Sequence, residues 1–191
     1  MYLLLISSVA VAAIGIERFR FYSRAVGDNE NFLSALSERL KNRDAGEALS
    51  FCNSENSCVG FIAAAGVKAA VAGDNVELAL NVAYDDVAMK LRARLNYLSM
   101  IVTLAPLLGL LGTISGMIDA FNILSIQAGQ PLAITGGIGE ALIATATGLC
   151  VSIFALIVHT YFAQKLDEAL TALDKTVNVV LANLEAHHET P

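Results

Sequence analysis

The stretch that decides how this chain folds is Gly136–Gly148, with the sequence GGIGEALIATATG. It places a carboxylate, Glu140, among small and hydroxylated residues, and no lysine or arginine occurs between Leu98 and Ala163. A carboxylate inside an apolar membrane segment is costly, so such a residue is a functional-site candidate by default. The stretch therefore predicts a membrane helix that carries a functional carboxylate.

The composition is typical of an integral membrane protein. Of the 191 residues, 55% are hydrophobic, and the mean hydropathy is +0.60. The net charge of −6 argues against a nucleic-acid partner, which would require a basic face. Cys52 and Cys58 have no histidine near them and do not match a zinc spacing, so we expect no metal site.

Three apolar runs predict three transmembrane helices, at Tyr2–Ile16, Leu98–Leu124 and Ile134–Ala163. All twelve lysines and arginines follow the first run, precede the second or follow the third, and the connection Ser125–Pro131 is uncharged. The positive-inside rule places these flanks in the cytoplasm. We therefore expect an all-α membrane protein, N-terminus outside and C-terminus inside. Two of its helices extend far into the cytoplasm, and short cytoplasmic helices complete it.

The first run is short. Its fifteen residues cover roughly 22 Å of a hydrocarbon core about 30 Å thick. A signal peptide is disfavoured because no positive charge precedes the run. We expect either an abbreviated outer end, from a misplaced start, or an extension through Phe19–Tyr22 while Arg18 snorkels to the surface.

These segments predict four regions. Residues 1–24 form the first transmembrane helix and its basic flank, and residues 25–97 form a cytoplasmic helical region. Residues 98–163 form a transmembrane helix pair with a short periplasmic hairpin. Residues 164–191 form a cytoplasmic C-terminal helix and tail.

Helical periodicity within residues 25–97 predicts several short helices. One is centred on Phe32–Leu40 with Asp28 as its cap, a second runs from Asp44 to Phe51, and a third covers Val59–Val71. Asp74–Glu77 resembles a capping box with the aspartate as the cap.

Two of the predicted helices are long. No breaker follows the capping box until Pro106, so we expect one helix from Val76 to Leu124. The third span likewise continues past the membrane, as a stripe of apolar residues with heptad spacing between Leu166 and Leu184. This stripe is expected to pack on its own subunit, on neighbouring subunits, or on both.

The second and third spans carry small residues at spacings that favour close helix packing. Pro106 is expected to kink the second span. The residues assigned to packing are Pro106, Gly109, Gly112, Gly116, Gly137 and Gly148.

Two threonines are predicted to lie at the same depth. Thr113 and Thr145 are each sixteen residues from Gly129, the middle of the expected hairpin. Both are therefore about 24 Å along their helices from the turn. Small residues and threonines in membrane helices also serve packing alone, and a threonine can bond its own backbone without any pore.

Glu140 shares a helix face with Ala144 and Thr147. It is protonated, sits in a water-filled cavity, or is charged against a partner outside this chain. The structural alternative is a cap at the start of the third span, where glycines would loosen the first turn. We favour an ion pathway lined by Glu140, Thr113, Thr145 and Thr147, with Asp119 nearer the outer mouth. No nucleophile–base pair, metal spacing or phosphate loop is present, so we expect no enzyme and no catalytic residue.

Two motifs carry a family resemblance. They are PLLGLLGT at 106–113 and GIGEALIATATG at 137–148. Together with the three-span topology, they resemble the ExbB/TolQ/MotA proton-channel family, and ExbB most. The resemblance implies a multi-pass protein of the bacterial inner membrane that forms a pentameric ring, with no cofactor other than the proton motive force.

The resemblance also implies partners. A single-span protein similar to ExbD or TolR would lie inside the ring, and a TonB-like protein would receive the work. Thr113 and Thr145 would face the membrane aspartate of the single-span partner, and Glu140 would line the pore near its outer end. The expected function is to energise TonB-dependent transport across the outer membrane. A TolQ-like role in envelope maintenance, a non-conducting scaffold, and sodium in place of protons remain alternatives.

Overall fold

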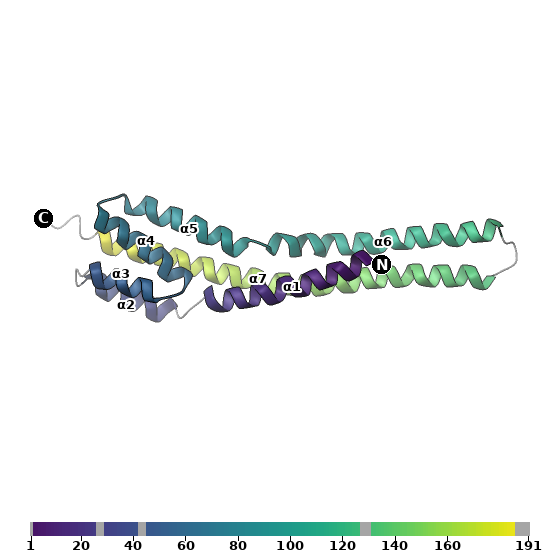
Figure 1. Cartoon of the computed structure of the whole chain (residues 1–191), viewed down its shortest axis with the longest axis horizontal. Helices are drawn as coiled ribbons and strands as arrows, with labels where there is room; N and C mark the ends of the chain where they lie inside the picture. Colours follow the sequence, from purple (N-terminus) through teal and green to yellow (C-terminus); the bar gives the residue numbers. More distant parts are fainter. Residues whose placement is uncertain (1, 26–28, 42–44, 127–130, 186–191) are drawn as a thin grey trace. The chain divides into compact units, whose positions relative to one another are not determined.

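The structure, a computed structural model, describes residues 2–25, 29–41, 45–126 and 131–185. These residues are nearly all helical (Figure 1). Three stretches are long and apolar enough to cross a membrane: Tyr2–Ser23, Val76–Asn122 and Thr135–Leu184. The prediction of an all-α protein with three apolar spans is confirmed. The predicted hairpin falls largely on residues 127–130, which lie outside the described residues.

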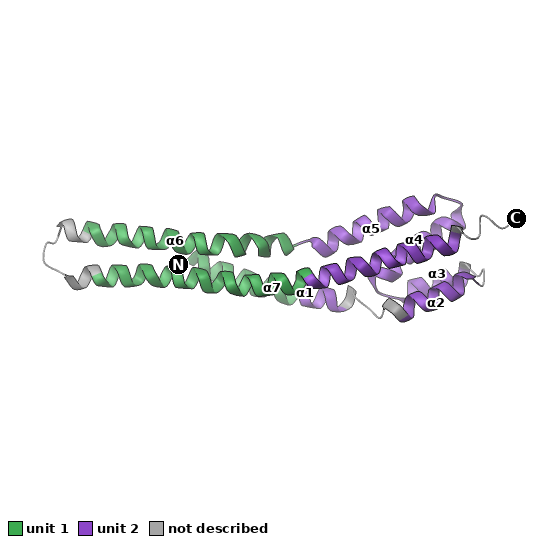
Figure 2. Ribbon diagram, turned by 180° about the vertical axis from the view of Figure 1, so that it is seen from behind, with its two compact units in different colours: residues 1–17, 94–163 green, residues 18–93, 164–191 purple. Residues whose placement is uncertain are grey.

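The chain divides into two compact units (Figure 2). Unit 1 comprises residues 1–17 and 94–163, and unit 2 comprises residues 18–93 and 164–191.

Unit 1 is built from three helices that lie side by side: the first part of α1 (Tyr2–Ala25), all of α6 (Leu95–Ile126) and the first part of α7 (Pro131–Glu185). Leu4, Ala105 and Val151, one from each helix, form its buried core. Other large apolar side chains of α1, such as Ile6 and Val9, are exposed. Exposed apolar side chains on long apolar helices are typical of surfaces that face lipid.

Unit 2 contains the end of α1, the end of α7 and four shorter helices. These are α2 (Asn29–Lys41), α3 (Ala45–Ser54), α4 (Cys58–Ala72) and α5 (Val76–Arg92). Along the chain, α2 packs on α3, α3 on α4 and α4 on α5. The short helices predicted from periodicity are therefore confirmed. The caps predicted at Asp28 and Asp44 lie outside the described residues.

In the core of unit 2, helices α4, α5 and α7 pack against one another at Gly66. A Cβ atom there would lie 2.7 Å from Leu80 Cδ2 and 2.9 Å from Val180 Cγ1. Both of these partners are fully buried. Contact at this range leaves no room for a side chain, so the glycine lets the three helices approach closely.

The cap predicted at Asp74 is wrong. Asn75 is the N-cap of α5, and its side chain accepts a hydrogen bond from the Leu78 amide at 2.8 Å. Asp74 instead completes the end of α4, where Gly73 adopts φ 74° and the Asp74 amide donates to the Ala69 carbonyl. Asn and Asp are about equally good N-caps. Because Asp74 already takes part in the C-terminal turn of α4, Asn75, which is nearer to α5, caps α5 instead.

The single helix predicted from Val76 to Leu124 is also wrong. The chain leaves helical geometry at Ala93 and Arg94, and Arg94 has φ 68°. A non-glycine residue is uncommon in this conformation, which disrupts a helix.

Side chains of α1 satisfy the free carbonyls at the end of α5. Arg18 Nη1 donates to the Lys90 carbonyl at 3.1 Å, and the Tyr22 hydroxyl donates to the Leu91 carbonyl at 2.9 Å. The last carbonyls of any helix lack partners within it, so these two bonds stabilise the end of α5 where it stands. Arg18 is 4% exposed. It does not snorkel to the surface, although α1 does continue through Phe19–Tyr22.

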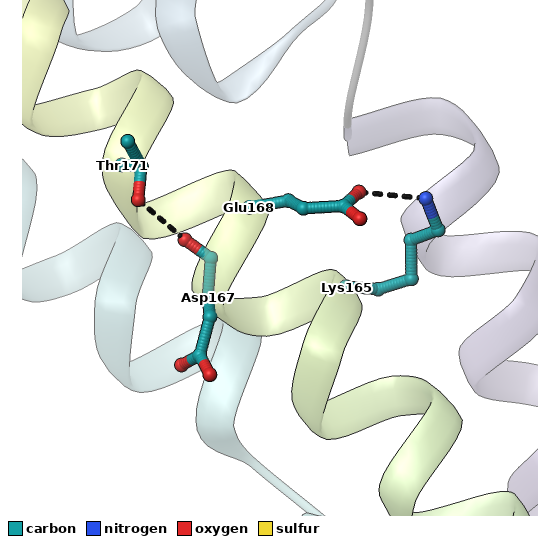
Figure 3. Close-up of polar contacts among 4 residues, drawn as sticks. All are labelled: Lys165, Asp167, Glu168 and Thr171. Atoms are coloured by element: carbon teal, nitrogen blue, oxygen red, sulfur yellow. Dashed lines mark hydrogen bonds and ion pairs between the residues drawn. The ribbon is translucent and has the colours of Figure 1, made fainter.

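The helix α7 is continuous over 55 residues, as the lack of a stop signal predicted. Within unit 2, its heptad stripe is buried at Leu173 and Val180 and only partly buried elsewhere. The opposite face is polar. Lys165 pairs with Glu168 at 2.6 Å, and Thr171 donates to its own helix at the Asp167 carbonyl (Figure 3). The stripe therefore packs at least in part on its own chain.

Candidate functional site

The predicted packing glycines lie along the line where α6 and α7 touch within unit 1. A Cβ atom at Gly112 would lie 2.8 Å from Ala144 Cβ, and one at Gly116 would lie 2.8 Å from Ala141 Cβ. A Cβ atom at Gly148 would lie 2.6 Å from the Ala105 carbonyl oxygen. Gly109 and Gly137 make similar close approaches. The two helices thus meet backbone to backbone, as small residues allow in lipid.

Thr113 and Thr145 meet across this line. Their hydroxyl oxygens are 3.4 Å apart, so the prediction that they share one depth is confirmed. The Thr145 hydroxyl donates to the Gly109 carbonyl at 3.0 Å, and the Thr113 hydroxyl donates to the Leu110 carbonyl at 2.7 Å. A hydroxyl has a single proton but two lone pairs. With both protons directed to backbone carbonyls, the pair retains lone pairs that can accept a hydrogen bond.

A second hydroxyl bond between α6 and α7 was missed from the sequence. Ser152 Oγ donates to the Val102 carbonyl at 2.6 Å. Pro106 has no N–H and leaves the carbonyl four residues earlier, that of Val102, without its helical partner. Ser152 lies seven residues after Thr145, on the same helix face. That spacing, together with the proline, was the signal that could have revealed the bond.

Thr147 lies apart from the threonine pair. It is half-buried, and its hydroxyl donates to the Ile143 carbonyl of its own helix at 2.8 Å. Bonding of this kind is common for threonines in helices. The structure therefore brings together Thr113 and Thr145, and does not add Thr147 to them.

Glu140 is the tenth residue of α7, which is helical from Pro131 through the glycine-rich stretch. The capping alternative is therefore wrong, since free amides occur only in the first turn. The side chain is exposed, one turn before Ala144, which packs on α6. It makes no hydrogen bond or ion pair with any residue that the structure describes.

The electrostatics of unit 1 leave Glu140 without a cation. Arg94 is the only lysine or arginine in residues 1–17 and 94–163, and it pairs with Glu17. Asp119 is exposed on α6, next to Ala120, which packs on the Gly137 position. An acidic side chain thus stands exposed on each helix of the pair, toward the end away from Arg94.

Comparison with known proteins places both motifs in one family. The sequence model of the MotA/TolQ/ExbB proton channel family matches residues 54–175, which include the threonine pair, the glycine contacts and Glu140. The chain belongs to the MotA/TolQ/ExbB proton channel family. The resemblance inferred from the two motifs is confirmed.

Individual relatives in this family carry ExbB and TolQ names. A protein named ExbB-like 1 from Synechocystis sp. is 33% identical over 168 residues, which are 83% of this chain and 64% of that protein. The Tol-Pal system protein TolQ of Haemophilus influenzae is 31% identical over 84% of this chain and 76% of its own length. ExbB of Salmonella typhimurium is 33% identical over 45% of this chain and 36% of its own length. The chain thus spans less than two thirds of the Synechocystis and Salmonella relatives.

Proposed function

We propose that this chain is the ring-forming subunit of a proton-driven motor in the bacterial inner membrane, which energises TonB-dependent transport across the outer membrane. The observation that carries the proposal is Glu140. It is an exposed carboxylate without a cation, beside the contact line of α6 and α7, in the region that matches the proton channel family.

The orientation follows from charge. With the basic flanks inside, the N-terminus is periplasmic and the C-terminus cytoplasmic. In this orientation Glu140 and Asp119 lie toward the periplasm, the threonine pair lies near mid-membrane, and helices α2 to α5 of unit 2 are cytoplasmic. Residues 25–97 and 164–191 then form the cytoplasmic regions.

The ring is an assembly of several copies, five by resemblance to the family, around the single-span helices of a partner similar to ExbD or TolR. Exposed apolar side chains of α6 and α7, such as Leu111 and Leu142, are available for contacts with neighbouring copies and lipid. The α6–α7 pairs would form the wall around the partner, and a TonB-like protein would receive the work.

The cycle begins at the periplasmic side, where a proton passes Glu140 and neutralises the partner's membrane aspartate. A neutral carboxyl can pass an apolar wall that a carboxylate cannot, because burial of a charge costs several kcal/mol. Thr113 and Thr145 suit this step, since their free lone pairs can accept a hydrogen bond from the neutral carboxyl. Release of the proton to the cytoplasm resets the cycle, and the membrane potential supplies about 2.3 kcal/mol per charge per 100 mV.

A TolQ-like role in envelope maintenance is the second candidate. The match to TolQ of Haemophilus influenzae, over 76% of that protein, favours it. The two candidate functions use the same proton pathway and differ in the protein to which the motor transmits its mechanical work.

Complementation of a deletion strain tests the proposal and separates the two candidates. Glu140→Gln and Thr145→Val should abolish growth on iron chelates as the sole iron source, while Thr171→Val, on the exposed face of α7, should not. If the parental chain instead restores resistance to detergents and not iron uptake, the TolQ-like role is correct. If Glu140→Gln and Thr145→Val both restore growth on iron chelates and detergent resistance as well as the parental chain does, the proposed proton pathway is contradicted.

A further inference from the structure

Unit 2 contains an open cavity of about 530 Å³ that the proposed function does not use. It is lined from α1 by Arg20 and Phe21, from the start of α4 by Ser57, Cys58 and Phe61, and from α5 by Lys90. Asn56 and Val87 complete the wall. Among the described residues, the wall therefore contains two cations, two aromatic rings and several hydrogen-bonding groups, and no carboxylate.

The two cations stand in different settings. Arg20 is exposed and makes no ion pair or hydrogen bond with any residue in the described part of the chain. Lys90 pairs with Asp86 at 2.6 Å and lies 6.0 Å from the Phe61 ring centroid. Because both side chains of that pair are exposed to solvent, at 62% and 44%, the ion pair stabilises the fold little, and Lys90 can bind a stronger anion instead.

A third positive charge lies behind the wall. Arg18 is 4% exposed, its guanidinium lies 5.1 Å from the Phe21 ring centroid, and it bonds the Lys90 carbonyl. Its Nε atom is buried without a hydrogen-bond partner among the described residues. The positive potential in the cavity therefore includes a charge that water screens poorly.

We propose that this cavity binds the phosphate group of an anionic ligand. Arg20 and Lys90 hold the phosphate oxygens, since charge-assisted bonds to phosphate are the strongest these side chains make. Ser57 and Asn56 offer further polar contacts in the wall, and the rings of Phe21 and Phe61 cover the apolar part of the ligand. The cavity size suits a small organic phosphate or a phospholipid headgroup.

The position of the cavity favours the headgroup of an anionic phospholipid. Arg20 and Phe21 fall within the last residues of the first apolar span, Tyr2–Ser23, at its basic end. Basic and aromatic residues at this level of a span lie among the lipid headgroups. A soluble phosphate ester has the same chemistry, so the test includes both sources.

The test measures how fast a neutral maleimide alkylates Cys58, which lines the cavity. The full-length chain is placed in nanodiscs of phosphatidylcholine, of phosphatidylcholine with phosphatidylglycerol, or of phosphatidylcholine with added glycerol 3-phosphate. Mass spectrometry resolves the three cysteines. Protection of Cys58 by phosphatidylglycerol alone identifies a lipid headgroup, and protection by glycerol 3-phosphate identifies a soluble ester. Equal rates in all three conditions would overturn the proposal.

Matched variants separate the site from a general charge effect. Arg20→Gln and Lys90→Gln should each raise the half-protecting ligand level about fivefold, the usual effect of one basic side chain on an anionic headgroup. Lys68→Gln removes the same charge from an exposed position of α4 outside the cavity and should change nothing. Equal effects of all three variants would also overturn the proposal. The parental chain gives the lipid comparison without any substitution, so misfolding of a variant does not remove the test.

Discussion

Ser152 on α7 donates a hydrogen bond of 2.6 Å to the Val102 carbonyl on α6. This is the carbonyl that Pro106 leaves without a helical partner. The proline and the serine therefore act as a pair. Pro106 leaves a carbonyl of α6 without its donor, and Ser152 donates to that carbonyl and so joins α6 to α7. Apolar helices need such bonds, since lipid offers no partner to a free carbonyl.

Loss of the Ser152 hydroxyl should destabilise the α6–α7 pair, and the size of the effect should depend on whether residue 106 is proline. Ser152→Ala should lower the free energy of unfolding in detergent by about 1 kcal/mol, the scale of hydrogen bonds between membrane helices. In a Pro106→Ala background the helix regains its own donor for Val102. There Ser152→Ala should have little effect. A double-mutant cycle with no coupling energy would contradict the pairing.

Replacement of a glycine by alanine in α6 or α7 should be tolerated only where the glycine does not lie between the two helices. Gly148→Ala would put its Cβ 2.6 Å from the Ala105 carbonyl, whereas nothing lies within 4 Å of a Cβ at Gly139. We expect Gly148→Ala to lower the free energy of unfolding by about 1–3 kcal/mol, because the backbones must separate. Gly139→Ala should be neutral or stabilising by up to about 1 kcal/mol, from helix propensity. Thermal unfolding of the two variants checks this, and equal midpoints would refute the close approach.

The end of α5 should depend on the Tyr22 hydroxyl. Tyr22→Phe leaves the Leu91 carbonyl without this donor in a buried setting, which should lower the stability of unit 2 by about 1–3 kcal/mol. Tyr97→Phe alters a tyrosine that is 61% exposed and should change stability by less than about 0.5 kcal/mol. Hydrogen exchange at the amides of α5 measures the difference. Unchanged protection in Tyr22→Phe would show that the hydroxyl does not stabilise this helix end.

Thiol reactivity should report the burial of α3. Burial raises the pKa of Cys52 to about 11 and also raises the pKa of Cys58. The raised pKa keeps the thiol protonated, so at pH 8 only about 0.1% of Cys52 is thiolate. Its alkylation should be very slow at pH 8, should rise about tenfold per pH unit, and should level off only near pH 11. A plateau near the ordinary value of 9.0 would mean that α3 opens readily.

Much of this structure could be predicted from the sequence, because membrane helices obey strong local rules. Apolar length gives the three spans, and equal distance from the turn gives the level shared by Thr113 and Thr145. Small residues at Gly112 and Gly116 mark the face of α6 that meets α7. Each of these signals lies within one helix or one hairpin, where the register follows from counting residues.

The errors arose where a distant segment decides the outcome. The end of α5 is stabilised by Arg18 and Tyr22, about seventy residues earlier in the chain, and periodicity carries no such information. The choice of Asn75 over Asp74 depends on how α4 ends at Gly73. The Ser152 bond required the proline and the serine to be considered together.

Measurement of proton flux shows whether Glu140 faces a water-filled proton path. The chain is co-purified with a single-span protein similar to ExbD or TolR and placed in liposomes that contain a pH-sensitive dye. We predict that Glu140→Gln lowers proton flux under an imposed potential by about tenfold or more, as loss of a proton-transfer group does. Glu168→Gln, which removes an exposed carboxylate paired with Lys165, should leave it unchanged. A flux in Glu140→Gln equal to that of the parental chain would show that Glu140 is not part of the proton path.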